Sequence, residues 1–262
     1  MENNDMNVLA IIQARMSSSR LPRKMTLPII DGKGALELML ERVAECANIN
    51  SLAVATTIET DDDEIAALCA ELGVECVRGS LDDVLDRFHT AMAIHPDADT
   101  IVRLTGDCPL HDPDVIDTII AKFAETDADY LSNVAPPTFP DGLDTEVLTR
   151  KALEKTWSDA KKTSEREHVT LHIRNHPEKF KLANHENPEN LSSLRWTLDE
   201  PADLKFIAAV YERLYPVNPR FGMRDVLMLL KEHPELSNIN TGIARNEGLE
   251  KSLALESEKE KR

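Results

Sequence analysis

The sequence contains no long uninterrupted apolar segment, because charged residues break every hydrophobic run well short of a membrane span. Residues 1–7 carry no basic stretch leading into an apolar one, which argues against a secretory signal. Cysteine is scarce, and Cys46, Cys69, Cys76 and Cys108 form neither a CxxC pair nor a zinc-like spacing. We therefore expect reduced thiols in a cytoplasmic protein with no membrane partner.

Positive charge is also scarce, with 30 Lys and Arg against 47 Asp and Glu, a net charge of −17. Long nucleic acid requires a cationic surface, so it is not an expected partner. Between Gln13 and Lys24, however, the chain holds Arg15, Arg20, Arg23 and Lys24 and no acid. In so acidic a protein, this segment is where an anion is expected to bind.

Short apolar runs alternate with amphipathic segments along the first half of the chain. The runs at 8–12, 52–56, 74–77 and 100–104 predict strands, and the segments at 35–47, 61–72, 81–94 and 113–124 predict helices. This alternation is typical of an α/β fold with a mostly parallel sheet covered by helices on both faces.

The pattern changes after about residue 130. A Pro- and Gly-rich loop is expected at 135–143, a helix at 164–175 and a strand at 194–198. We expect a single domain over residues 1–246, with a substrate-side section at about 130–190, and a charged tail at 247–262.

The cationic segment IIQARMSSSRLPRK (11–24) directly follows the first expected strand. Open α/β sheets bind ligands at this carboxyl edge. A triphosphate requires several N–H donors and compensating positive charge, which a loop of small residues flanked by Arg and Lys provides. The segment is neither a GxxxxGK nor a GxGxxG loop. The alternative interpretation is a solvated basic loop.

Two aspartates follow other expected strands, Asp107 in RLTGDCPL and Asp199 in RWTLDEPAD. A buried strand that delivers a carboxylate to this edge can hold a Mg²⁺ ion that bridges phosphates. Each has a structural alternative. Asp107 lies in a sequence that also suits a turn, and Asp199 precedes Pro201 where it can cap a helix.

Six ordered motifs together resemble the cytidylyltransferase family that activates acidic sugars, and the likeness extends over nearly the whole chain. They are IIQARMSSSRLPRK, RGSLDDVLDRF (78–88), VRLTGDCPL (102–110), FPDGLDTEVL (139–148), SEREHVTLHI (164–173) and RWTLDEPADL (195–204). The sequence is most similar to the spore coat polysaccharide biosynthesis protein F branch. Acylneuraminate and 3-deoxy-manno-octulosonate cytidylyltransferases are more distant, and their first loop is rich in glycine where this chain has Ser17, Ser18 and Ser19.

The resemblance implies a nucleotide-diphospho-sugar transferase fold, Rossmann-like and three-layered, in a homodimer that uses CTP and Mg²⁺. Asp107 and Asp199 are implied to hold the metal, and with Arg15 and Lys24 they form the expected catalytic set. The residues expected to bind the nucleotide are Gln13, Ala14, Arg15, Ser18, Arg20, Lys24, Arg78, Ser80 and Thr105. Those expected to bind the sugar are Asp141, Asp144, Glu146, Arg166, His168 and Arg174.

Alternatives stay open for several of these residues. The segment Arg78 to Ser80 is implied to lie near the base, but it also fits a plain turn in which Ser80 and Asp82 cap a helix. Arg166 or Arg174 can pair with a sugar carboxylate, yet residues 165–168 also fit a charged helix face. His168 can be a structural hydrogen bonder, and His89, His111, His172 and His176 carry no readable signal.

The expected reaction is attack of a sugar hydroxyl on the α-phosphorus of CTP, which releases pyrophosphate and forms a CMP-sugar for surface polysaccharide synthesis. Such transfers depend on positioning and charge neutralisation, which fits a site of cations and carboxylates. By resemblance the sugar is a nonulosonic acid. Two other functions are considered: a glycosyltransferase that uses a nucleotide sugar, although a DxD motif is absent around Asp107, and a non-catalytic nucleotide- or sugar-sensing module.

Overall fold

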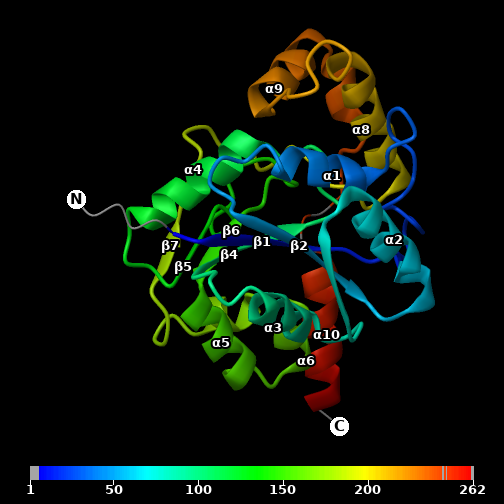
Figure 1. Ribbon diagram of the computed structural model, residues 1–262. Helices are drawn as coiled ribbons and strands as arrows, with labels where there is room; N and C mark the ends of the chain where they lie inside the picture. The colour runs from blue at the N-terminus through cyan, green and yellow to red at the C-terminus, as the bar shows by residue number, and fades with distance from the viewer. Residues whose placement is uncertain (1–5, 244, 246, 261–262) are drawn as a thin grey trace.

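A seven-stranded sheet forms the centre of the computed structural model, which describes residues 6–243, 245 and 247–260 (Figure 1). The strands are β1 Val8–Gln13, β2 Ser51–Thr57, β3 Glu75–Gly79, β4 Thr100–Thr105, β5 Tyr130–Ser132, β6 Glu146–Thr149 and β7 Leu182–Asn184. Their order in the sheet is β3-β2-β1-β4-β6-β5-β7. Strand β6 runs antiparallel to both neighbours, and the other neighbouring pairs are parallel. The predicted α/β fold with a mostly parallel sheet is confirmed.

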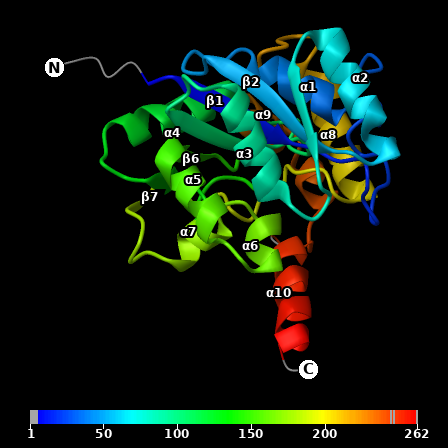
Figure 2. The same cartoon turned by 60° about the horizontal axis from the view of Figure 1, so that its bottom comes forward.

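Helices cover both faces of the sheet. One face carries α1 Ala35–Val43, α2 Asp63–Leu72, α4 Pro113–Ala124, α8 Pro201–Leu214 and α9 Met223–Glu232. The other carries α3 Val84–Ile94, α5 Arg150–Asp159 and α6 Thr163–Glu167, together with α7 Leu171–Asn175, which Figure 2 labels. Short 3₁₀ helices occur at Thr60–Asp62 (η1) and Pro234–Asn238 (η2).

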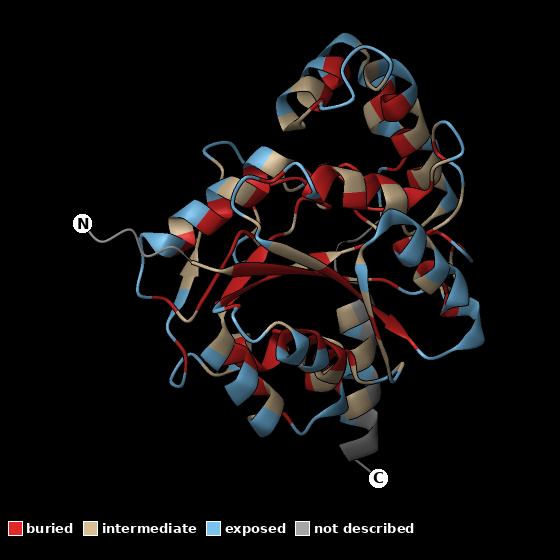
Figure 3. Cartoon of the chain, in the orientation of Figure 1, coloured by how far each residue is buried: buried red, intermediate tan, exposed pale blue. Residues whose placement is uncertain are grey.

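Strand β1 supplies side chains to both hydrophobic cores. Val8, Ala10 and Ile12 pack on the face of α1, whereas Leu9 and Ile11 pack on the face of α3. Successive side chains of a strand point to opposite faces, so a strand covered on both sides is apolar throughout. Figure 3 shows the same distribution, with buried residues in the sheet and on the inner sides of the helices. The two covered faces leave the strand ends as the place for a polar site.

Two of the expected elements differ from the structure. The helix expected at 164–175 is broken into α6 and α7, because the backbone leaves the helical region at His168 and the β-branched Val169 turns into the core. The strand expected at 194–198 is wrong. Its single bridge pairs Arg195 with Asp141, and Leu198 donates its backbone N–H to Asp107 instead of a strand. This extended segment ties two loops together at the sheet edge.

The charged tail expected at 247–262 forms helix α10 (Glu247–Glu260), and residues 261–262 lie outside the described residues. Helix α10 lies beside α6 and projects from the body of the molecule (Figure 2). The Ser164 hydroxyl on α6 donates to a carboxylate oxygen of Glu256 over 2.7 Å. Within the described part of the chain, no helix combines the length and the apolarity needed to cross a membrane.

Gly142 allows the loop after β5 to approach the extended segment closely. Its φ of 110° lies in a region that favours glycine, and a Cβ there would lie 2.6 Å from the backbone carbonyl carbon of Trp196. Around it, Trp196 donates its N–H to the carbonyl of Asp141 over 2.6 Å. A side chain at this position would therefore separate two loops that carry site residues.

Replacement of Gly142 tests this contact. We expect Gly142→Ala to lower the free energy of unfolding by about 3 kcal/mol, from backbone strain and backbone overlap together. Gly73→Ala is the matched control, since Gly73 also has a positive φ of 67° but its added Cβ would meet no atom of the described residues within 4 Å. Its expected loss is about 1 kcal/mol. Urea denaturation measures both, and equal losses would contradict the proposed close approach.

Candidate active site

A cavity of about 580 Å³ opens at the carboxyl ends of β1 and β4. This is the edge at which parallel sheets bind ligands. Most of the expected site residues line it: Gln13, Ala14, Arg15, Ser18, Arg20, Lys24, Thr105, Asp107, Asp141, Asp144, Glu146, His168, Arg174 and Asp199. A larger cavity of about 1500 Å³ lies between α1, α4, α8 and α9, and its lining includes none of the expected residues.

The cationic loop after β1 is held in place by a buried carboxylate. Asp62, 2% exposed, accepts the backbone N–H of Met16 at 2.7 Å with one oxygen and that of Thr57 at 3.1 Å with the other. Met16 is itself buried, whereas Arg15 and Ser17 on either side of it are exposed. The loop is thus anchored at one residue while its polar neighbours line the cavity.

Lys24 lies between the two aspartates that were expected to hold a metal. Its Nζ is 2.6 Å from Oδ2 of Asp107 and 2.8 Å from Oδ1 of Asp199. Burial opposes the protonated form of Lys24, but the two carboxylates outweigh it and raise the pKa of the ammonium. Burial likewise opposes ionisation of Asp199, yet Lys24 and then Arg20 lower the pKa of that carboxyl. The group is a charged triad.

Backbone hydrogen bonds fix both aspartates. Gly106 donates its N–H to the carbonyl of Gln13 at 2.9 Å, which holds the turn after β4 against the end of β1. Asp203 is fully buried and accepts the N–H groups of Asp199 and Glu200, both at 2.9 Å. Helix α8 begins after Glu200, so the alternative in which Asp199 caps this helix is wrong. Its carboxylate is left to face the cavity.

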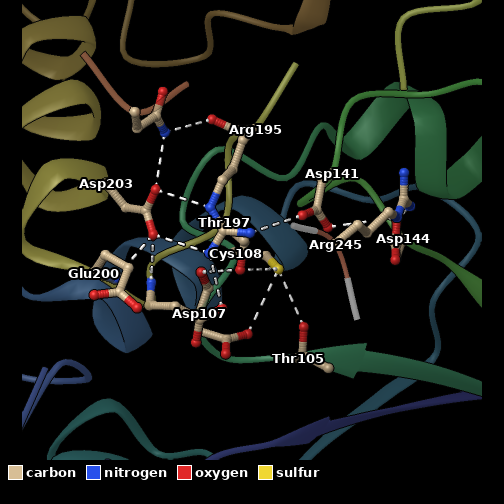
Figure 4. A network of polar contacts seen from close by, with 12 residues as sticks. Thr105, Asp107, Cys108, Asp141, Asp144, Arg195, Thr197, Glu200, Asp203 and Arg245 are labelled. Atoms are coloured by element: carbon tan, nitrogen blue, oxygen red, sulfur yellow. Dashed lines mark hydrogen bonds and ion pairs between the residues drawn. The ribbon is translucent and has the colours of Figure 1, made fainter. Parts of the chain in front are cut away.

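Arg195 links the carboxylates of this edge, as Figure 4 shows. Its guanidinium is 3.0 Å from Asp203, 3.1 Å from Asp141 and 3.1 Å from Asp199. The side chain is buried, and a planar guanidinium can satisfy several carboxylates in fixed directions. Arg195 opens one of the six motifs, but no role was expected for it. Its signal is an arginine beside Trp196 in an otherwise apolar segment.

Asp141 and Asp144 lie together on the other side of Arg195 (Figure 4), and Arg245 pairs with Asp144. Burial, and then the charge of Asp144, raise the pKa of Asp141 from 3.8 to about 6, although Arg245 and Arg195 oppose this. Burial also raises the pKa of Asp144. These carboxyls are suited to accept hydrogen bonds from hydroxyl groups.

Arginines also gather in the cavity, from the loop after β1 and from α3, β4 and α7. Arg15, Arg87, Arg103 and Arg174 line it, and we call these four residues the cationic wall. Arg103 pairs with Glu146 over 2.7 Å, directly across the β4–β6 register. Burial alone would raise the pKa of Glu146, but the charges of Arg103 and Arg174 outweigh it and lower the pKa. Arg87 and Arg103 were not among the expected site residues. For Arg103, the signal in the sequence is a charged residue within an otherwise apolar strand.

Two donors of the cationic wall lack partners. Among the described residues, neither Nε of Arg87 nor Nε of Arg174 finds a hydrogen-bond acceptor, although both atoms are buried. Burial, together with the charge of Arg15, lowers the pKa of Arg87 to about 10. Buried donors without partners cost stability. An anionic ligand in the cavity can remove that cost.

Three expected residues do not line the cavity. The guanidinium of Arg166 holds both carboxylate oxygens of Asp83, with contacts of 2.6 to 2.9 Å. Arg78 donates to the carbonyls of Thr57 and Glu59, and Ser80 is exposed. The alternative role of Ser80 and Asp82 as helix caps is also wrong. Asp83 caps α3 by accepting the N–H of Asp86 at 2.9 Å.

His168 follows α6 and lines the cavity. Its Nε2 is 3.1 Å from the hydroxyl of Ser252 on α10, and that hydroxyl donates to Glu167 over 2.8 Å. Burial lowers the pKa of His168. The hydrogen-bonding role considered for this histidine is therefore present at the mouth of the cavity.

Comparison with known proteins gives a consistent set of similarities. The model of the family described as Cytidylyltransferase matches residues 9–217. An uncharacterized protein of Methanocaldococcus jannaschii is 38% identical over 242 residues, which cover 91% of this chain and 96% of that protein. The spore coat polysaccharide biosynthesis protein SpsF of Bacillus subtilis is 33% identical over 237 residues, 87% of this chain and 96% of that protein.

Solved structures agree with the sequence relatives. A cytidylyltransferase from Leptospira borgpetersenii superposes with a TM-score of 0.85 at 33% identity and covers 92% of this chain and 100% of that one. CMP:2-keto-3-deoxy-manno-octonic acid synthetase, solved as a complex with CTP, has a TM-score of 0.59 at 18% identity over 79% of this chain and 99% of that one. The second similarity is a similarity of fold alone.

The raised pKa of Asp141 predicts a pH-dependent stability. The pKa of this carboxyl is about 6 in the folded state and 3.8 in the unfolded chain, so the folded state binds its proton more tightly. Protonation therefore stabilises the fold, and this contribution is lost as pH rises from about 4 through about 6. Asp141→Asn has no such loss. Relative to the wild type, its free energy of unfolding should therefore rise by about 2.5 kcal/mol between about pH 4 and about pH 7.5. Urea denaturation at both pH values measures this, and a pH-independent difference would contradict it.

Proposed function

Because the chain belongs to the cytidylyltransferase family, we propose that it transfers CMP from CTP to a hydroxyl of an acidic sugar and releases pyrophosphate. The resemblance expected from the six motifs is confirmed, as is the enzyme class, a nucleotidyltransferase. The observation that carries the finer proposal is the triad of Lys24, Asp107 and Asp199 beside a cationic loop. A site of this kind stabilises phosphate charge without covalent catalysis.

Asp107 and Asp199 fit a divalent metal, and we propose Mg²⁺. Their carboxylates come from segments far apart in the chain and converge on a single cation, Lys24. Carboxylates and phosphate oxygens are the ligands that Mg²⁺ prefers. When bound, the metal supplies charge to the α-phosphate and acidifies the attacking hydroxyl.

Lys24 then changes partners. We propose that its ammonium, which pairs with Asp107 and Asp199 without ligand, would pair with the phosphates of CTP if these two carboxylates held a metal, so that the cavity would not hold two bare carboxylates. Arg15 and Arg20 would assist Lys24 in neutralising the charge that develops on pyrophosphate. Arg20 pairs with Asp199 and Glu200 without ligand, at 3.1 and 3.2 Å, so it moves from the same carboxylate.

The sugar fits the two groups of charged residues in the cavity. Asp141 and Asp144 can accept sugar hydroxyls, and the cationic wall can hold the carboxylate, which gives Nε of Arg87 and of Arg174 an acceptor. Because Arg166 is occupied by Asp83, Arg174 is the better of the two expected carboxylate binders. A nonulosonic acid carries both a carboxylate and several hydroxyls, and the name of the Bacillus subtilis relative supports use in surface polysaccharide synthesis.

The homodimer, the cytoplasmic location and a role in a spore coat stay predictions. So does the division into one domain over residues 1–246 and a tail. The non-catalytic sensing module is disfavoured by the family and by the intact charged triad. The glycosyltransferase alternative, in contrast, would release no pyrophosphate from a nucleotide and a sugar, so an assay of pyrophosphate release distinguishes it directly.

An assay of pyrophosphate release tests the function. CTP, ATP, GTP and UTP are each incubated with a panel of acidic sugars, with and without Mg²⁺. We expect release with CTP, Mg²⁺ and a nonulosonic acid, at a kcat/KM at least about 100-fold above that of the other nucleotides. No release from any combination would contradict the proposal, and consumption of a nucleotide sugar added in a parallel incubation would favour the glycosyltransferase.

Variants assign the activity to the cavity. Asp107→Asn and Asp199→Asn should each lower kcat by about 10³-fold or more, because the metal and the charge balance of the triad are lost. Asp97→Asn is the control, since Asp97 is an exposed acid outside the cavity. Circular dichroism shows whether each variant is folded. Full turnover of folded Asp107→Asn would exclude the metal role.

A further inference from the structure

A glutamate and two histidines lie close together outside the active-site cavity. Glu165 is on α6, His172 is on α7 and His176 directly follows α7. One potential ligand atom from each residue lies within 4.8 Å of the others. Glu165 and His172 are buried, and His176 is half-buried. None of the three lines the cavity described above.

His172 is a buried side chain without hydrogen bonds. It is 3% exposed, and neither Nδ1 nor Nε2 has a hydrogen-bond partner among the described residues. Nearly all buried polar atoms in folded proteins are satisfied, so an imidazole with two unpartnered nitrogens calls for a ligand. The nearest charged group, Oε1 of Glu165, is 3.1 Å from Nδ1 but not in a hydrogen-bonding direction.

That distance suits two ligands of one metal ion. With bonds of about 2.0–2.1 Å and tetrahedral angles, ligand atoms around Zn²⁺ are about 3.3 Å apart. In such a site the carboxylate oxygen and the imidazole nitrogen both point at the ion and not at each other. A buried ion pair between Glu165 and His172 would instead require an N–H aimed at the carboxylate.

His176 is prepared for the same role. Its Nδ1 is 2.8 Å from the carbonyl oxygen of His172, so Nδ1–H donates there and Nε2 keeps its lone pair free. Metal-binding histidines commonly fix their second nitrogen in this way. His172 and His176 are four residues apart, a spacing that brings two side chains to one side of a helix, and their rings stack with centroids 4.1 Å apart.

We propose that Glu165, His172 and His176 bind one Zn²⁺ ion, with water as the fourth ligand on the partly exposed side of His176. Two imidazoles and one carboxylate are a known ligand set of zinc, whereas Mg²⁺ prefers an all-oxygen octahedral set. The ion joins α6 to α7. His168 and Thr170 lie between these helices and Arg174 lies on α7, and all three line the active-site cavity. Zinc at this position would therefore fix the part of the cavity lining that these residues form.

The first measurement is the zinc affinity of the full chain after removal of metal with EDTA. Competition with a chromophoric chelator, in the presence of excess Mg²⁺, should give one Zn²⁺ per chain. His176→Gln should lower the affinity by about 100-fold or more. His89→Gln is the matched control, because His89 is a half-buried histidine that stacks on Trp157 outside the cluster, and it should bind zinc as the wild type does.

Two further variants separate this site from other ligands in the chain. Asp107→Asn removes a carboxylate of the proposed Mg²⁺ site, and Cys76→Ser removes the more exposed thiol of the neighbouring pair Cys69 and Cys76. Both should keep one Zn²⁺ per chain. Loss of zinc in either variant, or its retention in His176→Gln, would overturn the proposal, as would the absence of stoichiometric zinc in the wild type.

A measurement of Tm shows whether a loss of zinc binding in His176→Gln comes from misfolding of the variant. EDTA-treated His176→Gln should have a Tm close to that of the EDTA-treated wild type, because His176 is half-buried. Added Zn²⁺ should raise the Tm of the wild type and of His89→Gln but not that of His176→Gln. An equal rise in all three proteins would contradict the assignment. Neither readout depends on cytidylyl transfer, so the two proposals can fail separately.

Discussion

The ion pairs of Lys24 with Asp107 and Asp199 are the constraint on which the site depends. Two carboxylates at one sheet edge repel each other unless a cation lies between them, and a buried cation is stable only beside such carboxylates. The ammonium therefore ties the loop after β1 to the turn after β4 and to the segment before α8. Asp62 and Asp203, both buried, hold the ends of these segments through backbone N–H groups.

The charge of the cavity is divided. Several carboxylates gather around Lys24, Arg195 and Arg245, whereas the cationic wall comes from the loop after β1 and from α3, β4 and α7. Arg103 of this wall pairs with Glu146. A ligand that carries phosphates, a carboxylate and hydroxyls matches this division better than a ligand of one charge. The zinc site proposed between α6 and α7 lies outside the cavity and would affect it indirectly, because it would fix the segment that positions His168 and Arg174.

Features that depend on local sequence were predictable. The first four strands, the cationic loop after β1 and the position of Asp107 after a strand follow from short patterns, whereas the strand expected before Asp199 is wrong. Features that depend on distant partners were not predictable. Arg166 was expected at the sugar, but Asp83, distant in sequence, holds it. The role of Arg195 becomes visible only when Asp141, Asp199 and Asp203 surround it. The four-residue spacing of His172 and His176 is compatible with a metal site, but the third proposed ligand, Glu165, comes close to them only because the chain breaks between α6 and α7.

The exchange of Lys24 for a divalent metal is the central claim, and Mn²⁺ binding followed by electron paramagnetic resonance tests it most directly. Without nucleotide, the wild type should bind Mn²⁺ weakly because the ammonium occupies Asp107 and Asp199, and a non-hydrolysable CTP analogue should strengthen that binding. Lys24→Met should bind Mn²⁺ about 10-fold or more tightly than the wild type without nucleotide, since one elementary charge no longer competes. Equal Mn²⁺ affinity of the two proteins without nucleotide would contradict the exchange.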